Sequence, residues 1–293
     1  MKSETVRSAE AMAEHATSGA FLPLGWSGGE TLFRGEGNNL VVDGFFGIDS
    51  EPLAGEAGKA GMDLARRAVQ LYQKEGPSFL RRLRGSFAIA LWDSEKRRLL
   101  LATDHFGTRS LYVWSGKGRL AFAPRIKYLA DHAEVPKRID PNSLYFYLNH
   151  SFIPAPATIY QDIQRLEPGH CLIWEENKIS IIRYWDMSYP EDVRLDETAA
   201  ADLLRSSVEE SMHFLLRGDQ YSNHKAGAFL SGGTDSSTVV GLMMGLILIP
   251  IWRTYLLYGW SATHAAISAT FPKSPARRTA LSGSNMTWTG SAC

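Results

Sequence analysis

This sequence has little of what disulfide-rich, nucleic-acid-binding or membrane proteins depend on. Only two of its 293 residues are cysteine, Cys171 and Cys293, which excludes a disulfide scaffold and a zinc site built from cysteines alone. Its 31 Lys and Arg residues balance 31 Asp and Glu residues, so no net charge attracts nucleic acid or an anionic membrane. The polar start, MKSETVRSAEAMAEH, lacks the apolar core of a secretory signal. We therefore expect a cytoplasmic protein with no nucleic-acid partner and no membrane partner.

Acidic residues are absent from the last part of the chain. No Asp or Glu follows Asp235, and the composition of the tail becomes rich in Ala, Ser, Thr, Trp and Arg. The apolar run over residues 239–252 is shorter than the roughly 20 residues that cross a bilayer. The break in composition predicts an aberrant tail over residues 246–293, which a change of reading frame near Gly245 would explain. A divergent native tail is the alternative.

The length allows two domains, and the first part has the pattern of an α+β unit. Turn residues separate short apolar runs, whereas other stretches repeat apolar residues at helical spacing. The expected elements are a strand over 39–44 that ends in a turn, a helix over 61–74, an antiparallel meander of four strands within 86–123, helices over 125–131 and 141–149, and a hairpin within 170–185.

The second part opens like a parallel α/β domain. It follows a linker candidate at residues 189–192 and begins with a long amphipathic helix, roughly 197–217. A buried strand is expected over residues 226–230, and the segment SGGTDSS then leads into another helix. A glycine-rich segment between a strand and a helix is a typical place for an anion, because the helix N-terminus offers backbone N–H groups and a favourable dipole.

The composition of this loop indicates which anion. It has no Walker lysine, so it is not the common P-loop. Asp235 would repel a phosphate unless a divalent cation lay between them. The carboxylate and the neighbouring hydroxyls therefore predict magnesium-bound pyrophosphate. A turn that only caps the helix is the alternative.

Three stretches resemble the asparagine synthetase (glutamine-hydrolysing) family. LSGGTDSS, residues 230–237, resembles the family's pyrophosphate loop, LSGGxDSS. RGSFAIALWDSEKRRLLLATDHFGTRSLYV resembles part of its glutaminase domain, and IPAPATIYQDIQRLEPGH followed by RYWD resembles the passage that joins its two domains. The three matches follow the order in which the family carries them.

The resemblance implies a fold and a chemistry. The fold is an α+β N-terminal-nucleophile-type (αββα) glutaminase-like domain over residues 1–185, followed by the beginning of an α/β ATP-pyrophosphatase (PP-loop) domain over 193–245. The chemistry is ATP-dependent amidation of aspartate to asparagine through an aspartyl-adenylate, with glutamine or ammonia as nitrogen source. A homodimer is compatible with it. ATP and pyrophosphate, with Mg²⁺ on Asp235, would be bound by Leu230, Ser231, Gly232, Gly233, Thr234, Asp235, Ser236 and Ser237.

The chain departs from the family at the glutaminase site. The family's nucleophile is a cysteine at the mature N-terminus, whereas no cysteine here precedes Cys171, which lies in an apolar strand pattern. The family's Asn-Gly-Glu corresponds to Asp43, Gly44 and Phe45, so an apolar ring replaces a carboxylate that holds the substrate amine. Asp104 matches the family's glutamine-binding Asp, and an acidic turn residue is its alternative reading. We therefore predict no catalytic residue and a degenerate glutaminase.

Three hypotheses about function remain. The chain is a shortened member of a family of ATP-dependent carbon–nitrogen ligases and is inactive alone, or it is a non-catalytic remnant or scaffold, or it is a β-lactam synthetase-like ligase that acts on another carboxylate. The missing cysteine favours the second and third hypotheses over a complete asparagine synthetase. The short segment after the phosphate loop favours the second over the third.

Overall fold

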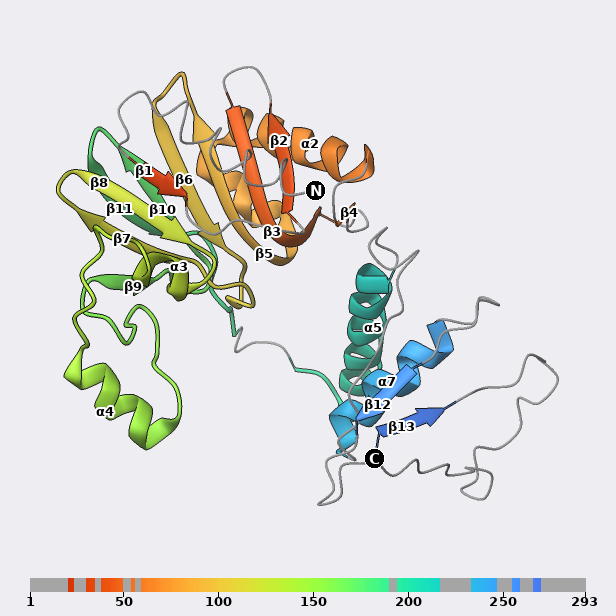
Figure 1. Cartoon of the computed structure of the whole chain (residues 1–293). Helices are drawn as coiled ribbons and strands as arrows, with labels where there is room; N and C mark the ends of the chain where they lie inside the picture. Colours follow the sequence, from red (N-terminus) through yellow and green to blue (C-terminus); the bar gives the residue numbers. More distant parts are fainter. Residues whose placement is uncertain are drawn as a thin grey trace. The chain divides into compact units, whose positions relative to one another are not determined.

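The computed structural model describes residues 21–23, 30–34, 38–49, 54–55, 59–189, 194–216, 233–246, 255–258 and 266–269. The chain divides into two compact units, Met1–Val193 and Arg194–Cys293 (Figure 1). Each unit is described by itself. The domain limits predicted at residues 185, 193 and 245 stay predictions.

The first unit is built on two β-sheets. The larger sheet is seven-stranded and antiparallel, in the order β11-β10-β6-β5-β3-β2, with β4 paired to β3. The smaller sheet has the order β1-β8-β7-β9, and β1 runs parallel to β8. The strands are β1 (Phe21–Pro23), β2 (Glu30–Arg34), β3 (Asn38–Ile48), β4 (Ala54–Gly55), β5 (Leu83–Asp93), β6 (Arg98–Thr103), β7 (Tyr112–Gly116), β8 (Arg119–Ala123), β9 (Ile163–Arg165), β10 (His170–Glu175) and β11 (Lys178–Arg183).

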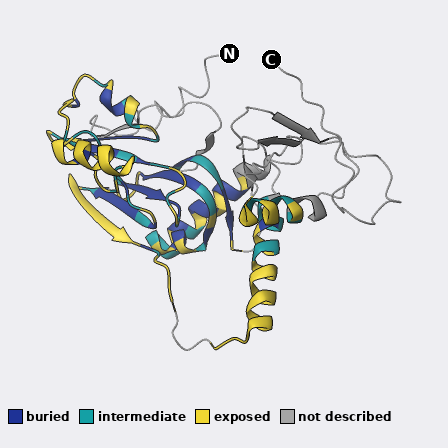
Figure 2. Ribbon diagram, turned by 90° about the horizontal axis from the view of Figure 1, so that it is seen from below, coloured by how far each residue is buried: buried dark blue, intermediate teal, exposed yellow. Residues whose placement is uncertain are grey.

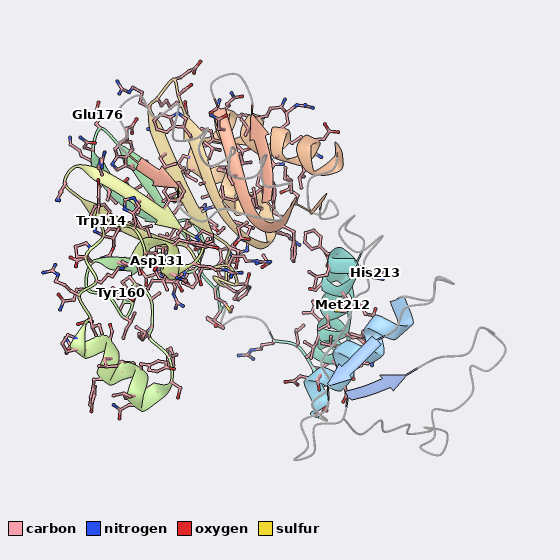
Figure 3. All side chains as sticks on the ribbon, in the orientation of Figure 1. Trp114, Asp131, Tyr160, Glu176, Met212 and His213 are labelled. Atoms are coloured by element: carbon pink, nitrogen blue, oxygen red, sulfur yellow. The ribbon has the colours of Figure 1, made fainter. Side chains whose placement is uncertain are left out.

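Alternating side chains along these strands form three layers of core. Phe87 and Ile89 of β5 pack in a cluster with α2 (Lys59–Glu75) and the 3₁₀ helix η1 (Gly76–Arg82), whereas Ala88 of β5 belongs to a cluster shared by the two sheets. A third cluster joins the smaller sheet to α3 (Ile126–Ala130). Trp114 and Tyr160, labelled in Figure 3, belong to that third layer. Figure 2 shows much of the two sheets in the dark blue of buried residues, whereas the edge strand β11 is exposed and yellow. The layer order is helix, sheet, sheet, helix, as the αββα prediction requires.

Two local predictions were wrong. The strand at 39–44 does not end in a turn, because β3 continues through Gly44 to Ile48. Gly44 has φ +106°, and a Cβ there would lie 2.1 Å from the carbonyl oxygen of Ser86, so only glycine fits. The four strands within 86–123 are not one meander, because β5 and β6 lie in the larger sheet and β7 and β8 in the smaller one.

The helices and the hairpin were predicted correctly. The predictions at 61–74, 125–131 and 141–149 correspond to α2, α3 and α4 (Pro141–His150), and the hairpin within 170–185 is formed by β10 and β11. The spacing of apolar residues within one element is a local signal, so it predicts that element independently of how the neighbouring elements pair.

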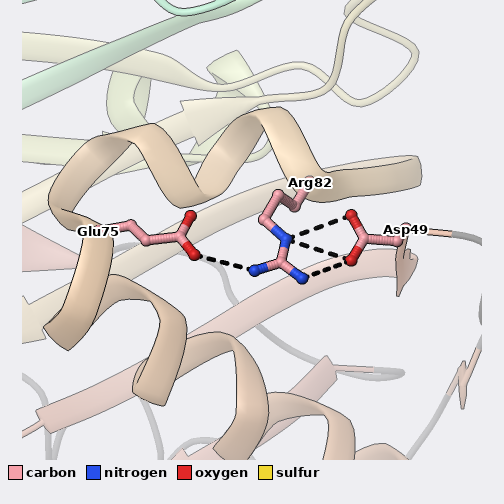
Figure 4. A network of polar contacts seen from close by, with 3 residues as sticks. All are labelled: Asp49, Glu75 and Arg82. Carbon is pink, nitrogen blue, oxygen red and sulfur yellow. Dashed lines mark hydrogen bonds and ion pairs between the residues drawn. The ribbon is translucent and has the colours of Figure 1, made fainter.

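One ion-pair network ties α2 and η1 to the end of β3 (Figure 4). The guanidinium of Arg82 lies 2.9 Å from Glu75 and 2.6 Å from Asp49, and the backbone N–H of Asp49 donates to the carbonyl of Arg82 at 2.8 Å. The Arg82 hydrogen bond lowers the pKa of the Asp49 carboxyl below its usual value. The network fixes where the chain leaves β3.

The second unit contains α5 (Glu197–Leu216), α7 (Thr234–Leu246) and an antiparallel pair, β12 (Tyr255–Tyr258) and β13 (Ala266–Ala269). The predicted helix at 197–217 is confirmed, and the Asp196 carboxylate caps it by accepting a hydrogen bond from the Ala199 N–H at 2.8 Å. The predicted strand at 226–230 lies outside the described residues, as does most of the tail after residue 246. No helix within the described ranges is long and apolar enough to cross a membrane.

Candidate functional site

The loop that leaves β6, residues 104–111, is organised around the buried carboxylate of Asp104, which is 1% exposed. Its Oδ1 accepts hydrogen bonds from the backbone N–H groups of Phe106, at 3.0 Å, and Thr108, at 3.1 Å. Its Oδ2 accepts from the N–H groups of Phe87, at 3.2 Å, and Arg109, at 3.1 Å, and from the Thr108 hydroxyl at 2.6 Å. A carboxylate offers roughly four lone-pair directions, so this one is saturated by its own surroundings.

The backbone of Asp104 fixes the same loop to two other segments. Its N–H donates to the carbonyl of Phe87 in β5 at 3.0 Å, and its carbonyl accepts from Gly107, at 3.1 Å, and from Gly169, at 3.0 Å. Gly107 has φ +62°, and a Cβ there would lie 2.9 Å from the Pro168 ring. The DHFG sequence is therefore a closed turn wedged between β5 and the segment before β10.

The residues predicted to line the glutamine pocket do meet at this end of the larger sheet. In the β3–β5 register, Asp43 lies opposite Ala88 and Phe45 opposite Ser86. Arg109, from the Asp104 loop, places Nη1 3.6 Å from Asp43 Oδ1. We call the set Asp43, Phe45, Ser86, Asp104, Thr108 and Arg109 the β3–β5 site.

Sequence reasoning missed three polar members of this site. Ser86 and Thr108 are joined by a hydrogen bond of 2.7 Å between their hydroxyls, and Arg109 is partly exposed. All three lie within the matched stretch RGSFAIALWDSEKRRLLLATDHFGTRSLYV, which was the signal that could have found them. The groups that could meet a ligand here are two hydroxyls and one guanidinium, which can bind a polar or anionic molecule but form no nucleophile–base pair.

His105, next to Asp104, packs among aromatic rings and is partly buried. Its ring lies 4.7 Å from the ring of Trp185 and 5.8 Å from that of Tyr184, between centroids. Its Nε2 is buried and has no hydrogen-bond partner within the described part of the chain. Burial lowers the pKa of His105, which keeps the imidazole neutral near pH 7. His105 is thus part of the loop's packing.

Cys171 lies in the core, as predicted. It is 0% exposed, and it belongs to the cluster between the larger sheet and α2. Burial raises the pKa of its thiol to about 11, so the thiol stays protonated at neutral pH. A buried, protonated thiol is no nucleophile.

The predicted phosphate loop is described from Gly233 onward; Leu230, Ser231 and Gly232 lie outside the described residues. The carbonyl of Gly233 accepts from the Ser237 N–H at 3.2 Å and from the hydroxyls of Ser236, at 3.2 Å, and Ser237, at 2.8 Å. Asp235 is exposed in the first turn of α7. These contacts lie within the first turn of α7, and the role of the loop in binding stays a prediction.

The donor set at α7 fits a magnesium ion held through a nucleotide. No group of three His, Cys, Asp or Glu residues that could hold a metal occurs in the described segments. Magnesium, however, is commonly held by one or two carboxylates together with substrate phosphates and water. Asp235 offers one such carboxylate, so it would hold the ion while the phosphates supply the other ligands.

Residues 67–185 match the glutamine amidotransferase domain family. The chain is 33% identical over 178 residues to a putative asparagine synthetase [glutamine-hydrolyzing] of Mycobacterium tuberculosis, which covers 58% of this chain and 27% of that protein. It is 29% identical over 201 residues to the amidase chyE of Penicillium rubens, covering 67% of this chain and 29% of that protein.

A solved structure of the Bacillus subtilis glutamine phosphoribosylpyrophosphate amidotransferase, complexed with ADP and GMP, is also similar. The identity is 12%, the TM-score is 0.31, and the match covers 78% of this chain and 47% of that one. The sequence match places a glutamine amidotransferase-like domain over residues 67–185 of the αββα unit. The resemblance of the chain to the glutamine-hydrolysing asparagine synthetases is confirmed, and the chain spans between a quarter and a third of the length of these curated relatives.

Proposed function

We propose that this chain is an asparagine synthetase-type protein whose amidotransferase domain does not hydrolyse glutamine. The observation that supports this proposal most directly is the burial of Cys171, because the resemblance assigns glutamine hydrolysis to a cysteine thiol. Cys171 is buried with a raised pKa, and the other cysteine of the sequence, Cys293, lies outside the described residues and far along the chain from the amidotransferase domain. Neither has the position that the family's nucleophile requires.

The β3–β5 site supports the same proposal. A bound glutamine would present its ammonium group to Asp104, but both oxygens of that carboxylate already accept hydrogen bonds from the loop. Phe45 stands where the resemblance requires a second carboxylate. Arg109 instead faces Asp43 at 3.6 Å. In this proposal Asp104 shapes the loop and does not bind substrate.

The finer proposal concerns ATP and the second unit. ATP and Mg²⁺ would bind at residues 230–237, and the family's chemistry would be amidation of aspartate by free ammonia through an aspartyl-adenylate. Two relatives, from Penicillium rubens and Gibberella zeae, are named amidases, which favours the alternative of amide chemistry on another carboxylate. For this chain by itself we propose the non-catalytic role of a scaffold.

Glutamine hydrolysis tests the main proposal. The purified chain, incubated with glutamine, is expected to release no more glutamate than a heat-killed sample. A Cys171→Ala variant is the matched control, because it removes the thiol without changing the β3–β5 site. Release of glutamate by the parent chain that a thiol alkylator abolishes would show a working nucleophile and would end the proposal.

A further inference from the structure

Arg109 has a guanidinium that forms no hydrogen bond within the part of the chain that the structure describes. Its nearest carboxylate is Asp43, with Nη1 3.6 Å from Oδ1. In every other described ion pair of an arginine the nitrogen lies 2.6–2.9 Å from the carboxylate oxygen. A guanidinium carries five N–H donors in a fixed plane. Those of Arg109 are therefore available to a ligand.

The fold holds this guanidinium in place although it forms no hydrogen bond. The backbone N–H of Arg109 donates to Asp104 Oδ2 at 3.1 Å, which fixes the start of the side chain. Its Nε lies 3.2 Å from the point that a Cβ of Gly44 would occupy, so the side chain crosses β3 where β3 has no side chain. The Arg109 side chain is 43% exposed. A cation that is already positioned and still accessible loses little freedom when a ligand binds.

Ser86 supplies a second donor beside the guanidinium. The Thr108 hydroxyl has one proton, and the shorter of its two contacts, 2.6 Å, is to the Asp104 carboxylate, so that proton belongs to Asp104. The Ser86 hydroxyl, 2.7 Å from Thr108 Oγ1, can then donate its own proton either to Thr108 or to a ligand. The carbonyl of Ser86 and Nε of Arg109 both lie against Gly44, so the two donors flank one glycine.

The charges around Arg109 favour an anion with a single charge. Asp43 lies 3.6 Å from the guanidinium, and the Asp104 carboxylate accepts from the backbone of the same residue. A dianion such as phosphate would bring its second charge close to both carboxylates, and like charges repel. A carboxylate has one charge and two oxygens in a plane, which match the N–H pairs of a guanidinium. A carboxylate is therefore the better ligand.

The same surroundings disfavour an ammonium group on that ligand. An ammonium next to the bound carboxylate would approach the guanidinium of Arg109, which repels it. Both oxygens of Asp104 already accept hydrogen bonds from the loop, and Asp43 faces Arg109. Phe45 lies opposite Ser86 in the β3–β5 register and offers an apolar ring. The rest of the ligand is therefore expected to be apolar.

We propose that the β3–β5 site binds a small carboxylic acid that has an apolar chain and no ammonium group, with Arg109 and Ser86 as donors to the carboxylate. The inference rests on the proposed function, because a site that no longer hydrolyses glutamine is free to hold another ligand. Arg109 is a binding residue in this proposal, and Asp43 and Gly44 position it.

Nuclear magnetic resonance of the full chain, labelled with ¹⁵N at arginine, tests the proposal with butyrate as the probe. The Arg109 signals are those that disappear in Arg109→Gln. Butyrate should shift them saturably, with a dissociation constant in the millimolar range, as expected for so small a ligand. 2-Aminobutyrate, which adds only the ammonium group, and inorganic phosphate should each bind about tenfold more weakly or less. Arg109 signals that do not respond to butyrate, or that respond equally to 2-aminobutyrate, would overturn the proposal.

Substitutions give an independent readout through saturation transfer from the protein to butyrate. Arg109→Gln should weaken binding about tenfold or more, because hydrogen bonds to a charged group are lost. Arg109→Lys keeps the charge without the planar fork and should also weaken it. The matched control is Arg119→Gln, since Arg119 is 40% exposed and already bonds to Glu134 at 2.6 Å, and butyrate binding should not change.

The outcomes separate this inference from the proposed function. Unchanged butyrate affinity in both Arg109 variants would overturn the inference. A chain that releases no glutamate and binds no butyrate would end the inference and leave the proposed function standing. A chain that binds butyrate through Arg109 and also releases glutamate would end the proposed function instead.

Discussion

The two loops that carry the family motifs differ in how their aspartates are held. Asp104 is 1% exposed, and its carboxylate accepts five hydrogen bonds, from backbone N–H groups of two segments and from one hydroxyl. Asp235 is exposed in the first turn of a helix whose neighbouring hydroxyls bond to the backbone of Gly233. The first carboxylate is part of the fold, whereas the second is accessible to a ligand. Removing each should therefore have opposite consequences.

The largest effect is expected for Asp104→Ala. The change leaves the buried N–H donor of Phe87 and the partly buried N–H donors of Phe106 and Arg109 without their acceptor, and an unsatisfied buried group costs about 1–3 kcal/mol. We expect the free energy of unfolding of the first unit to fall by about 3–5 kcal/mol in urea denaturation. Asp235→Ala is the control and should change it by less than about 1 kcal/mol. Equal small effects would show that Asp104 is not structural.

The second prediction compares a glycine packed against the β3–β5 site, Gly44, with a glycine that has open space around it, Gly118. Gly44→Ala would place a Cβ 2.1 Å from the Ser86 carbonyl oxygen at φ +106°, so β3 and β5 would have to separate. Gly118→Ala is the matched control, because Gly118 also has a positive φ, +73°, but its Cβ would have no neighbour within 4 Å. We expect Gly44→Ala to cost at least about 2 kcal/mol more than Gly118→Ala in thermal or urea unfolding. Similar costs would mean that the close approach is not what selects glycine.

The sequence predicted this fold where the signal was local and not where it was shared between sheets. Apolar spacing placed the helix at 61–74 within α2, and turn residues placed the hairpin of β10 and β11. The sequence did not predict that the chain passes from the larger to the smaller sheet between β6 and β7. Both faces of β5 and β6 are buried, so no polar face indicates which strands are their neighbours.

The site was predictable as a set of positions but not as a set of contacts. Asp43, Phe45 and Asp104 were identified by resemblance, and they do lie at one end of the sheet. The hydrogen-bond partners of Asp104 could not be predicted from the sequence. Four of the five are backbone N–H groups, which do not depend on the type of side chain. Resemblance identifies the position of such a residue. Only the structure shows that both oxygens of its carboxylate already accept hydrogen bonds from the protein.

The third prediction concerns pH and the same loop. Burial lowers the pKa of His105 in the folded state below the 6.5 of an exposed imidazole, so the unfolded chain binds the proton more readily. Stability from this group is therefore complete above pH 6.5 and decreases as the pH falls below it. His105→Gln should make the free energy of unfolding less dependent on pH between 7 and 5, because it removes the group whose pKa differs between the folded and the unfolded chain. An unchanged pH dependence in the variant would remove His105 as its source.

The smallest effect is expected at Asp235, and it is an effect on binding. An anion at an exposed helix N-terminus gains only about 0.3–1 kcal/mol from the helix dipole, because backbone donors there compete with water. A magnesium bridge through Asp235 would add to this, since the ion cancels the repulsion between carboxylate and phosphate. We therefore expect ATP or pyrophosphate to bind the chain only weakly and only with magnesium, with a dissociation constant in the millimolar range, about 4 kcal/mol.

Calorimetric titration of the full chain with ATP, with and without Mg²⁺, measures this. Asp235→Ala should abolish the binding and leave the unfolding free energy unchanged, the reverse of what Asp104→Ala does. Asp235→Asn separates charge from shape, since it keeps the size of the side chain but cannot neutralise the ion. Micromolar affinity in the parent, or AMP formation that depends on aspartate, would show that the second unit builds a complete nucleotide site, and the scaffold role proposed for this chain would be wrong.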